Sequence, residues 1–380
     1  NYDSKLFEDR ILFEGEKFVV DDNTLAAVIK ETYKGSKGIR WNFNDISGDV
    51  LGSIYEQYLG QIQREDGKEK KTSKRKSQGI YYTPRYIVDY IVQNTLGEIL
   101  KGKPAHEASK IKILDPACGS GSFLIKAFEV LDEHIKREKN QKGTDPLINY
   151  ARKFSILTSN IYGVDLDTEA VEIAQLNLLL KTLEIRERLP NLTHNIECGN
   201  SLISGIEEEL KKYFGNNWKD KKPFNWQEKF EDVFKQGGFD VIIGNPPYVN
   251  LANIKDKGDR EWLKNNFETA KNKSDLYSFF IERAIKLLKD GGLLGFIVSN
   301  SWLGTDSFSK FREYLIRNTK VLELVKLTPD VFKDAMVTPV LIFIKKEKIR
   351  KNHEIKLVEC RNGEFIKIPN RLTYERIINS

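Results

Sequence analysis

The chain has 380 residues, of which 40% are hydrophobic and 31% are charged, and its formal net charge at pH 7 is +6. This composition indicates a globular protein of one large domain with an appendage or of two domains, and no apolar run approaches the ~20 residues of a membrane span. The four histidines have no metal-ligand spacing. Three widely spaced cysteines form no disulfide framework, which favours a reducing cytoplasm.

Residues 1–78 have apolar positions at helical spacing and are expected to form a helical N-terminal and connector region. Its last part, residues 64–79, contains seven lysines and arginines and no aromatic residue. This segment fits a flexible linker and also a loop along nucleic-acid phosphates, and the two interpretations are compatible. The chain has no initiating methionine, so we expect it to be processed or cut from a longer protein.

Residues 79–350 alternate continuous apolar strands with amphipathic helices, which predicts a doubly wound, mostly parallel sheet. The expected strands cover residues 110–114, 160–166, 239–245, 293–300, 321–327 and 337–346. Thr83 and Pro84 have the residue types of an N-cap and a first helical position, so a helix is expected to begin there. Residues 351–380 are expected to start a C-terminal segment without a core of its own.

Polar residues and glycines follow several of these strands, at the edge where open α/β sheets bind ligands. In ILDPACGSGSF, Gly119 and Gly121 allow a tight turn, and Asp115 suits a cationic or amine-bearing ligand rather than a pyrophosphate. Asp165 suits a ribose diol, with Leu166 beside the base. Asn200 suits an adenine edge or a local Asx turn. These residue types together predict S-adenosylmethionine, which carries an adenosine and an amino acid but no phosphate.

The stretches DPACGSGSF, GVDLD and NPPY, in this order, resemble the S-adenosylmethionine-dependent DNA methyltransferases that modify amino groups. GIYYTPRYIVDYIV is similar to the motif before the cofactor loop in gamma-class adenine-N6 DNA methyltransferases. LGSIYEQYL resembles the helical connector of single-chain (type IIG) restriction-modification enzymes. The resemblance implies a Rossmann-like, seven-stranded methyltransferase sheet after an N-terminal helical region, with double-stranded DNA as partner.

The resemblance also implies roles for individual residues. The methionine side of the cofactor pocket would be lined by Tyr82, Thr83, Asp115, Ala117 and Gly119. Asp165 and Leu166 would hold the ribose and adenine, and Asn200, with Ser201 beside it, would contact the adenine. The family usually has Asp where this chain has Asn200, and an amide oxygen can still accept from the adenine amino group. Tyr277 fits either a place beside the cofactor or the core.

The loop Asn245-Pro246-Pro247-Tyr248 follows an expected strand and suits a planar amine. The Asn245 side-chain oxygen and the Pro246 carbonyl can accept from the two N–H groups, which localises the nitrogen lone pair. The two prolines stiffen the loop and fix where these acceptors point. A flipped-out adenine would then stack on Tyr248 and, by its position in the gamma-class pattern, on Phe332.

Adenine-N6 methylation of DNA within a restriction-modification or phage-defence system is therefore the leading hypothesis. Protein-glutamine N5, RNA and cytosine-N4 methylation are alternatives, as is a non-catalytic DNA-binding subunit. The basic segment after Tyr248 is expected beside DNA phosphates, and its cations are Lys255, Lys257, Arg260, Lys264, Lys271 and Lys273. The segment after residue 350 is too short for a sequence-reading domain, so a target-recognition domain is expected to be missing from this chain. No nuclease site is apparent, so a nuclease domain is expected to be missing as well if the whole enzyme restricts DNA.

Overall fold

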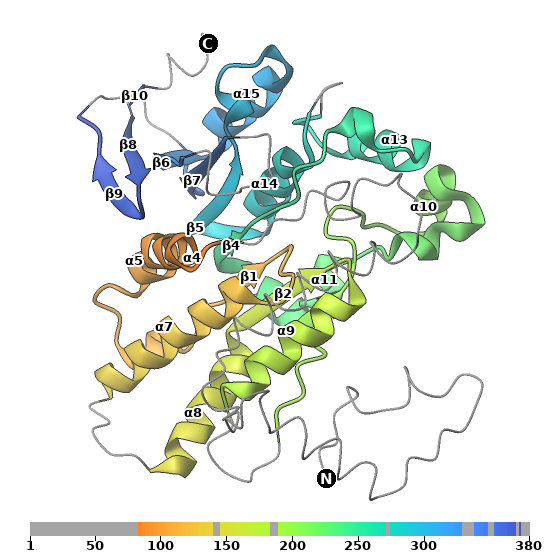
Figure 1. The fold of residues 1–380 in the computed structure, drawn as a ribbon. Helices are drawn as coiled ribbons and strands as arrows, with labels where there is room; N and C mark the ends of the chain where they lie inside the picture. The colour runs from red at the N-terminus through yellow and green to blue at the C-terminus, as the bar shows by residue number, and fades with distance from the viewer. Residues whose placement is uncertain are drawn as a thin grey trace, which may run out of the picture.

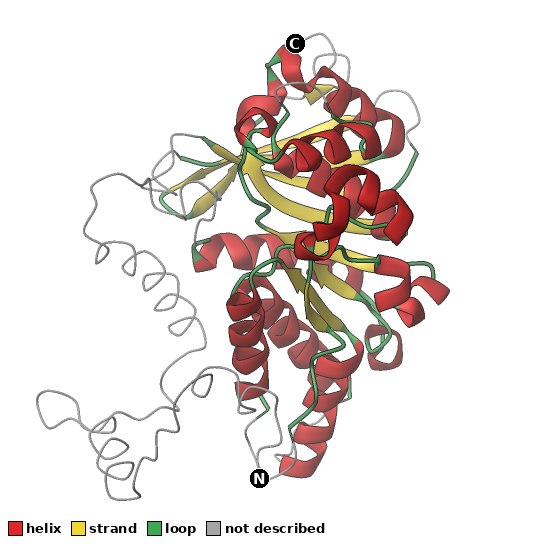
Figure 2. Ribbon diagram, turned by 90° about the vertical axis from the view of Figure 1, so that its right-hand side faces the viewer, coloured by secondary structure: helices red, strands yellow, loops and turns green. Residues whose placement is uncertain are grey.

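A computed structural model describes residues 83–139, 145–182, 189–270, 274–328, 338–348, 353–369 and 372–373. These residues form a mixed β-sheet with helices on both faces (Figures 1 and 2). The strands are β1 Ile113–Asp115, β2 Ile161–Asp165, β3 Ile196–Cys198, β4 Phe239–Gly244, β5 Leu288–Ser299, β6 Lys320–Lys326, β7 Pro339–Lys345, β8 Glu354–Arg361, β9 Glu364–Lys367 and β10 Leu372–Thr373. The predicted α/β class is confirmed. The basic segment 64–79, Tyr82 and Phe332 lie outside the described residues.

The strand order is β3-β2-β1-β4-β5-β7-β6, continued by β8 and β10, with β9 paired to β8. β1, β2, β3, β4 and β5 are parallel, and β7 runs antiparallel between β5 and β6. The chain moves outward from β1 to β3 and then returns to β4 on the other side of β1. This reversal places a topological switch point at the carboxyl ends of β1 and β4, where α/β sheets bind ligands.

The C-terminal strands extend this same sheet beyond the seven strands that were expected. β8 pairs in parallel with β6, and its Ile355, Val358 and Cys360 are buried in the core. The apolar residues of this strand therefore pack at the edge of the main sheet.

Two apolar layers cover the two faces of the sheet. One layer packs α11, α12, α14 and α15 against the strands, and the other packs α4, α7, α8 and α9 (Figure 1). The helices are α4 Arg85–Val92, α5 Glu98–Leu100, α6 Ala105–Ala108, α7 Ser122–Glu138, α8 Pro146–Ser159, α9 Thr168–Leu180, α10 Glu207–Phe214, α11 Trp226–Lys229, α12 Glu231–Lys235, α13 Lys257–Asn266, α14 Leu276–Leu287 and α15 Ser309–Asn318.

Helix α4 begins one residue later than its sequence indicated. Pro84 occupies the N-cap position, and its carbonyl accepts from the backbone N–H groups of Ile87 (2.9 Å) and Val88 (3.2 Å). The expectation that Thr83 caps this helix is wrong, because its hydroxyl makes no capping hydrogen bond. By contrast Asp167 caps α9 by accepting from Glu169 N at 3.0 Å.

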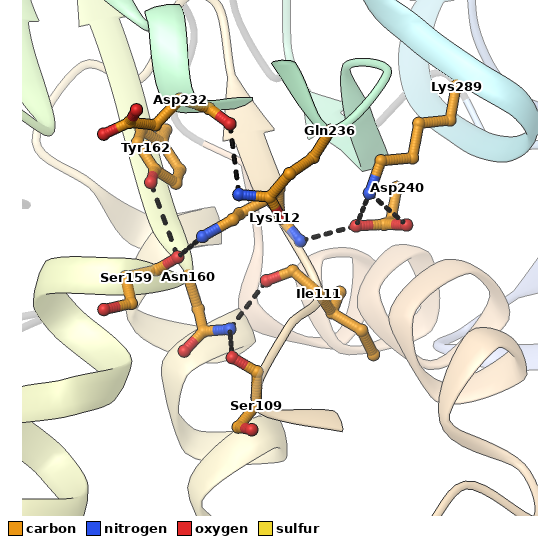
Figure 3. Close-up of polar contacts among 10 residues, drawn as sticks. All are labelled: Ser109, Ile111, Lys112, Ser159, Asn160, Tyr162, Asp232, Gln236, Asp240 and Lys289. Carbon is orange, nitrogen blue, oxygen red and sulfur yellow. Dashed lines mark hydrogen bonds and ion pairs between the residues drawn. The ribbon is translucent and has the colours of Figure 1, made fainter. Parts of the chain in front are cut away.

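A polar cluster joins the amino ends of β1, β2 and β4, opposite the edge where ligands are expected (Figure 3). Lys112 is buried, its Nζ donates to the Ser159 carbonyl (2.5 Å), and its backbone N–H donates to Asp240 Oδ2 (2.7 Å). Lys289 Nζ also donates to Asp240, at 3.0 Å from each oxygen. Burial, and then the charge of Lys289, lower the pKa of Lys112. Asp240 therefore accepts hydrogen bonds from the backbone N–H just before β1 and from the Lys289 ammonium.

Asp240→Ala should lower the free energy of unfolding by about 1–3 kcal/mol, because it leaves the Lys112 N–H and the Lys289 ammonium without their acceptor. Asp232→Ala is the matched control, since that carboxylate is 92% exposed, and it should change stability by about 0.5 kcal/mol or less. Urea denaturation followed by fluorescence measures both. Equal effects of the two substitutions would show that the cluster does not hold the strand ends.

Candidate active site

Four of the predicted site residues lie at the carboxyl edge of four adjacent strands. Asp115 and Asp165 are the last residues of β1 and β2, Asn200 lies two residues after β3, and Asn245 directly follows β4. Because β3, β2, β1 and β4 are neighbours in the sheet, these side chains form one row along its edge. The structure thus brings together residues that are up to 130 positions apart in the sequence.

The ends of β1 and β4 meet at Asp115 and Gly244. Asp115 is completely buried; its Oδ1 accepts from Ala117 N (3.0 Å), and its Oδ2 has no hydrogen-bond partner within the described part of the chain. Gly244 has φ +151°, and a Cβ added there would lie 2.6 Å from Asp115 Oδ1. Only glycine allows β4 to pass this close to the carboxylate. The loop that begins at Asn245 is therefore held directly against Asp115.

Burial raises the pKa of Asp115 to about 8, the hydrogen bond from Ala117 opposes the rise, and the charge of Asp165 adds to it. Burial also raises the pKa of Asp165, although the hydrogen bonds from Asp167 and Gly119 oppose this rise. Two carboxyl groups on neighbouring strand ends thus create a site that favours a cationic group.

Asp165 connects the loop after β2 to the glycine loop after β1. Its Oδ2 accepts from Gly119 N (2.8 Å) and its Oδ1 from Asp167 N (2.9 Å), so each oxygen keeps a second acceptor position. A Cβ added to Gly119 would meet nothing within 4 Å, so the space above this loop is open. Gly121, at φ +90°, lets α7 begin against Ala174 of α9.

The Asn200 side chain forms a local turn through its amide oxygen. Its Oδ1 accepts from the backbone N–H groups of Leu202 (3.1 Å) and Ile203 (3.3 Å). Its oxygen is therefore used by the backbone, as in an Asx turn, and its amino group is the arm that can reach a ligand. The hydroxyl of the neighbouring Ser201 is buried and donates to the Pro116 carbonyl (2.6 Å), which ties the loops after β1 and β3 together.

The Asn245 loop lies between α4 and the aromatic core. Asn245 Nδ2 donates to the Thr83 hydroxyl oxygen at 3.1 Å, and Pro246 is buried. Tyr248 is half-buried, and its ring makes an edge contact with the ring of Tyr277, with 6.4 Å between the centroids. Tyr277 is completely buried and stacks on Phe308, so it is a core residue that supports Tyr248.

Lys222 lies beside this edge and was missed in the sequence, because it occurs in a stretch of surface lysines. Its backbone adopts the left-handed region (φ 48°, ψ 52°), and its carbonyl accepts from Asn200 N at 2.7 Å. Its Nζ donates to the Leu166 carbonyl (3.1 Å) and to the Thr168 hydroxyl (3.0 Å). A cation therefore covers the turn after β2, next to the Leu166 side chain, which is 53% exposed.

The basic residues after Tyr248 have different environments. Lys257 pairs with Glu261 (3.6 Å), and the Arg260 guanidinium donates to the Ile254 carbonyl (2.5 Å). Lys255 and Lys264 are exposed and form no ion pair with any residue of the described ranges. These two lysines are the ones whose charge is available to an external anion.

Comparison with known proteins finds relatives that match most of this chain. The family model described as Eco57I restriction-modification methylase matches residues 159–332, and an RMKL-like methyltransferase domain model matches residues 105–191. The Escherichia coli type II restriction enzyme and methyltransferase RM.Eco57I is 34% identical over 343 residues, which cover 83% of this chain and 32% of that protein. The chain is therefore similar to the Eco57I restriction-modification methylase family over residues 159–332.

Other relatives of this Eco57I-like chain are more distant. The adenine-specific methyltransferase PglX of Streptomyces coelicolor is 26% identical over 293 residues, covering 71% of this chain and 23% of that protein. The solved structure of the type IIL restriction-modification enzyme MmeI with DNA superposes with a TM-score of 0.61 at 18% identity, covering 92% and 45% of the two chains. This likeness shows a shared fold. The Eco57I-like chain spans less than a third of the length of either curated relative.

Tyr82 and Phe332 remain predictions, since they lie outside the described residues. Among the residues that the structure describes, no helix has the length and apolar character needed to cross a membrane.

Gly244→Ala should destabilise the protein by about 1–3 kcal/mol, because the added Cβ would clash with Asp115 in a backbone region that favours glycine. Gly304→Ala is the matched control: its φ is −135°, and its Cβ would meet nothing within 4 Å. Thermal unfolding followed by circular dichroism measures both. Similar melting temperatures for the two variants would mean that β4 does not pack against Asp115.

The raised pKa of Asp115 has a consequence for stability in the absence of ligand. Its pKa is about 8 in the folded protein and near 3.9 in an unfolded chain. The unfolded state therefore loses this proton first, and stability present at low pH is lost as the pH rises from about 4 to about 8. Asp115→Asn should escape this loss, so its melting temperature relative to the parent should increase between pH 5 and pH 8 and then level off. Asp232→Asn is the surface control, and a flat difference for Asp115→Asn would contradict the prediction.

Proposed function

We propose that this protein transfers a methyl group from S-adenosylmethionine to the N6 amine of a flipped-out adenine in double-stranded DNA, within a restriction-modification or phage-defence system. The observation that carries the proposal is the contact of Asp115 with Gly244. It sets the polar pocket at β1 and β2 directly beside the Asn245 loop, so that a cofactor and a planar amine would lie next to each other.

The residues around Asp115 and Asp165 fit S-adenosylmethionine. Asp115 offers a buried acceptor oxygen that has no partner among the described residues, which suits the amine-bearing methionine end. Asp165 keeps acceptor positions for a ribose diol, and the exposed Leu166 can pack against the base. When bound, this cofactor supplies an electrophilic methyl group. The open space above Gly119 gives it room.

Asn200 would contact the cofactor adenine differently from the interpretation based on its sequence. Its oxygen already accepts two backbone N–H groups, so the arm left for the adenine is a donor. A donor matches a ring nitrogen of adenine and not its exocyclic amino group. The Asp that the family usually has would accept a hydrogen bond at this point, whereas Asn200 would donate one.

On the substrate side, Asn245 Oδ1 and the Pro246 carbonyl would accept from the two N–H groups of the adenine amine. This arrangement draws the nitrogen toward tetrahedral geometry and localises its lone pair, so the chain needs no strong base before transfer. Tyr248, supported by Tyr277, would stack on the flipped base. Such stacking contributes roughly 1–3 kcal/mol per base and would offset part of the cost of moving the base out of the duplex. Lys255 and Lys264 are available to phosphates.

The relatives favour this assignment over its alternatives. A restriction enzyme and methyltransferase and an adenine-specific methyltransferase both match most of the chain. These names support DNA over protein or RNA as the substrate, and adenine over cytosine as the base.

The test is to incubate the intact protein with labelled S-adenosylmethionine and either unmethylated duplex DNA or a protein extract, and to identify the labelled product after digestion. N6-methyladenine in DNA is expected. Asn245→Ala should lower the transfer rate by about 100-fold or more with little change in cofactor Kd, whereas Asp165→Ala should weaken cofactor binding. Asn318→Ala, at the opposite edge of the sheet, is the control. Label found only in protein would overturn the proposed function.

A further inference from the structure

The contact between Thr83 and Asn245 joins two segments that are 162 residues apart in the sequence. Thr83 is only 6% exposed and precedes Pro84, whose ring fixes the backbone at the start of α4. The Thr83 hydroxyl does not cap the helix, and its oxygen accepts a hydrogen bond from Asn245 Nδ2 at 3.1 Å. A side chain expected to serve the helix, or the methionine end of the cofactor, thus lies against the amide of the substrate loop.

We propose that Thr83 is a positioning residue that holds the Asn245 amide with its nitrogen inward and its oxygen toward the substrate amine. This inference rests on the proposed function, because it concerns how the same loop handles its target. It assigns Thr83 to the substrate side of the site, in addition to any contact with the cofactor.

The two ends of an amide have nearly the same shape but opposite hydrogen-bonding character. Rotation by 180° about the last torsion of Asn is permitted sterically, and it exchanges an acceptor for a donor. Only the oxygen can accept from the N–H of a substrate amine. In the rotated state two donors would face each other, so a productive site must stabilise one orientation.

No hydrogen-bonding side chain stands next to Asn245 in the chain. Pro246 and Pro247 have no N–H group, and Gly244 has no side chain. When the amide oxygen faces the substrate, its NH2 group points into the protein and needs an acceptor there. The Thr83 hydroxyl oxygen supplies an acceptor at 3.1 Å, and its removal would take away a hydrogen bond that favours the productive orientation.

Helix α4 provides a rigid support for this acceptor. Ile87, Val88, Ile91 and Val92 of α4 are buried in the core, and the Pro84 carbonyl is bonded to the first helical N–H groups. Thr83 is therefore fixed relative to the sheet, and it can hold the amide before the substrate arrives. Displacement of a reacting group by about 1 Å can cost on the order of 100-fold in rate.

The test compares Thr83→Val, which keeps the shape but removes the hydroxyl, with Thr83→Ser, which keeps the hydroxyl. Thr95→Val is the matched control, since Thr95 is also buried near α4 and its hydroxyl bonds only to helix carbonyls. The intact protein is mixed with saturating labelled S-adenosylmethionine and unmethylated plasmid DNA, and the single-turnover transfer rate is measured. The Kd for S-adenosylhomocysteine is measured by calorimetry, and the melting temperature of each variant verifies folding.

Thr83→Val should lower the single-turnover rate by about 10- to 100-fold, with an S-adenosylhomocysteine Kd within about twofold of the parent. Thr83→Ser should restore most of the rate, and Thr95→Val should change it less than about twofold. A weakened Kd with an unchanged rate at saturation would overturn the inference and make Thr83 a cofactor contact. An unchanged rate and Kd would overturn it as well. The identity of the product that the parent protein makes tests the proposed function separately. The ratio of variant to parent rate tests the role of Thr83, because it can be measured whichever amine is methylated.

Discussion

The close approach of β4 to the carboxylate of Asp115 is the constraint on which the site depends. Parallel strands can place two loops side by side, but a side chain at the end of β4 would keep them apart. Gly244 removes that barrier, because a Cβ at this position would lie 2.6 Å from Asp115 Oδ1. The switch point between β1 and β4 then becomes a continuous surface, with a carboxylate on one side and an amide on the other.

The carboxyl groups at the two ends of the sheet differ in whether their hydrogen-bond partners are complete. At the amino ends, both oxygens of Asp240 accept hydrogen bonds, from the Lys112 N–H and the Lys289 ammonium (Figure 3). At the carboxyl ends, Asp115 keeps an oxygen without a partner within the described residues, and burial raises its pKa. A buried carboxyl group with all its hydrogen-bond partners stabilises a fold. A buried carboxyl group that lacks a partner is a candidate for ligand binding.

Residues whose position follows from strand periodicity could be predicted from the sequence. Asp115, Asp165 and Asn245 each follow an apolar run, and parallel strands bring such residues to one edge. Contacts that depend on a side chain reaching across elements could not be predicted. Thr83 matched an N-cap pattern, but Pro84 took that position. The position of the Lys222 ammonium depends on how loops 20 or more residues apart pack together, whereas the Asx turn of Asn200 is local and was one of the two interpretations of its sequence.

The amide of Asn200 has a consequence for the choice of chemical probes. Because its oxygen is used by the turn, this residue would hold no acceptor against the exocyclic amine of the cofactor adenine. Analogues enlarged at that amine would then lose no hydrogen bond to Asn200, whereas replacement of the ring nitrogens would remove an acceptor. If Asn200 holds the cofactor as proposed, the exocyclic position is the one at which a reporter group would cost no hydrogen bond to this residue, whereas an Asp in its place would offer an acceptor there.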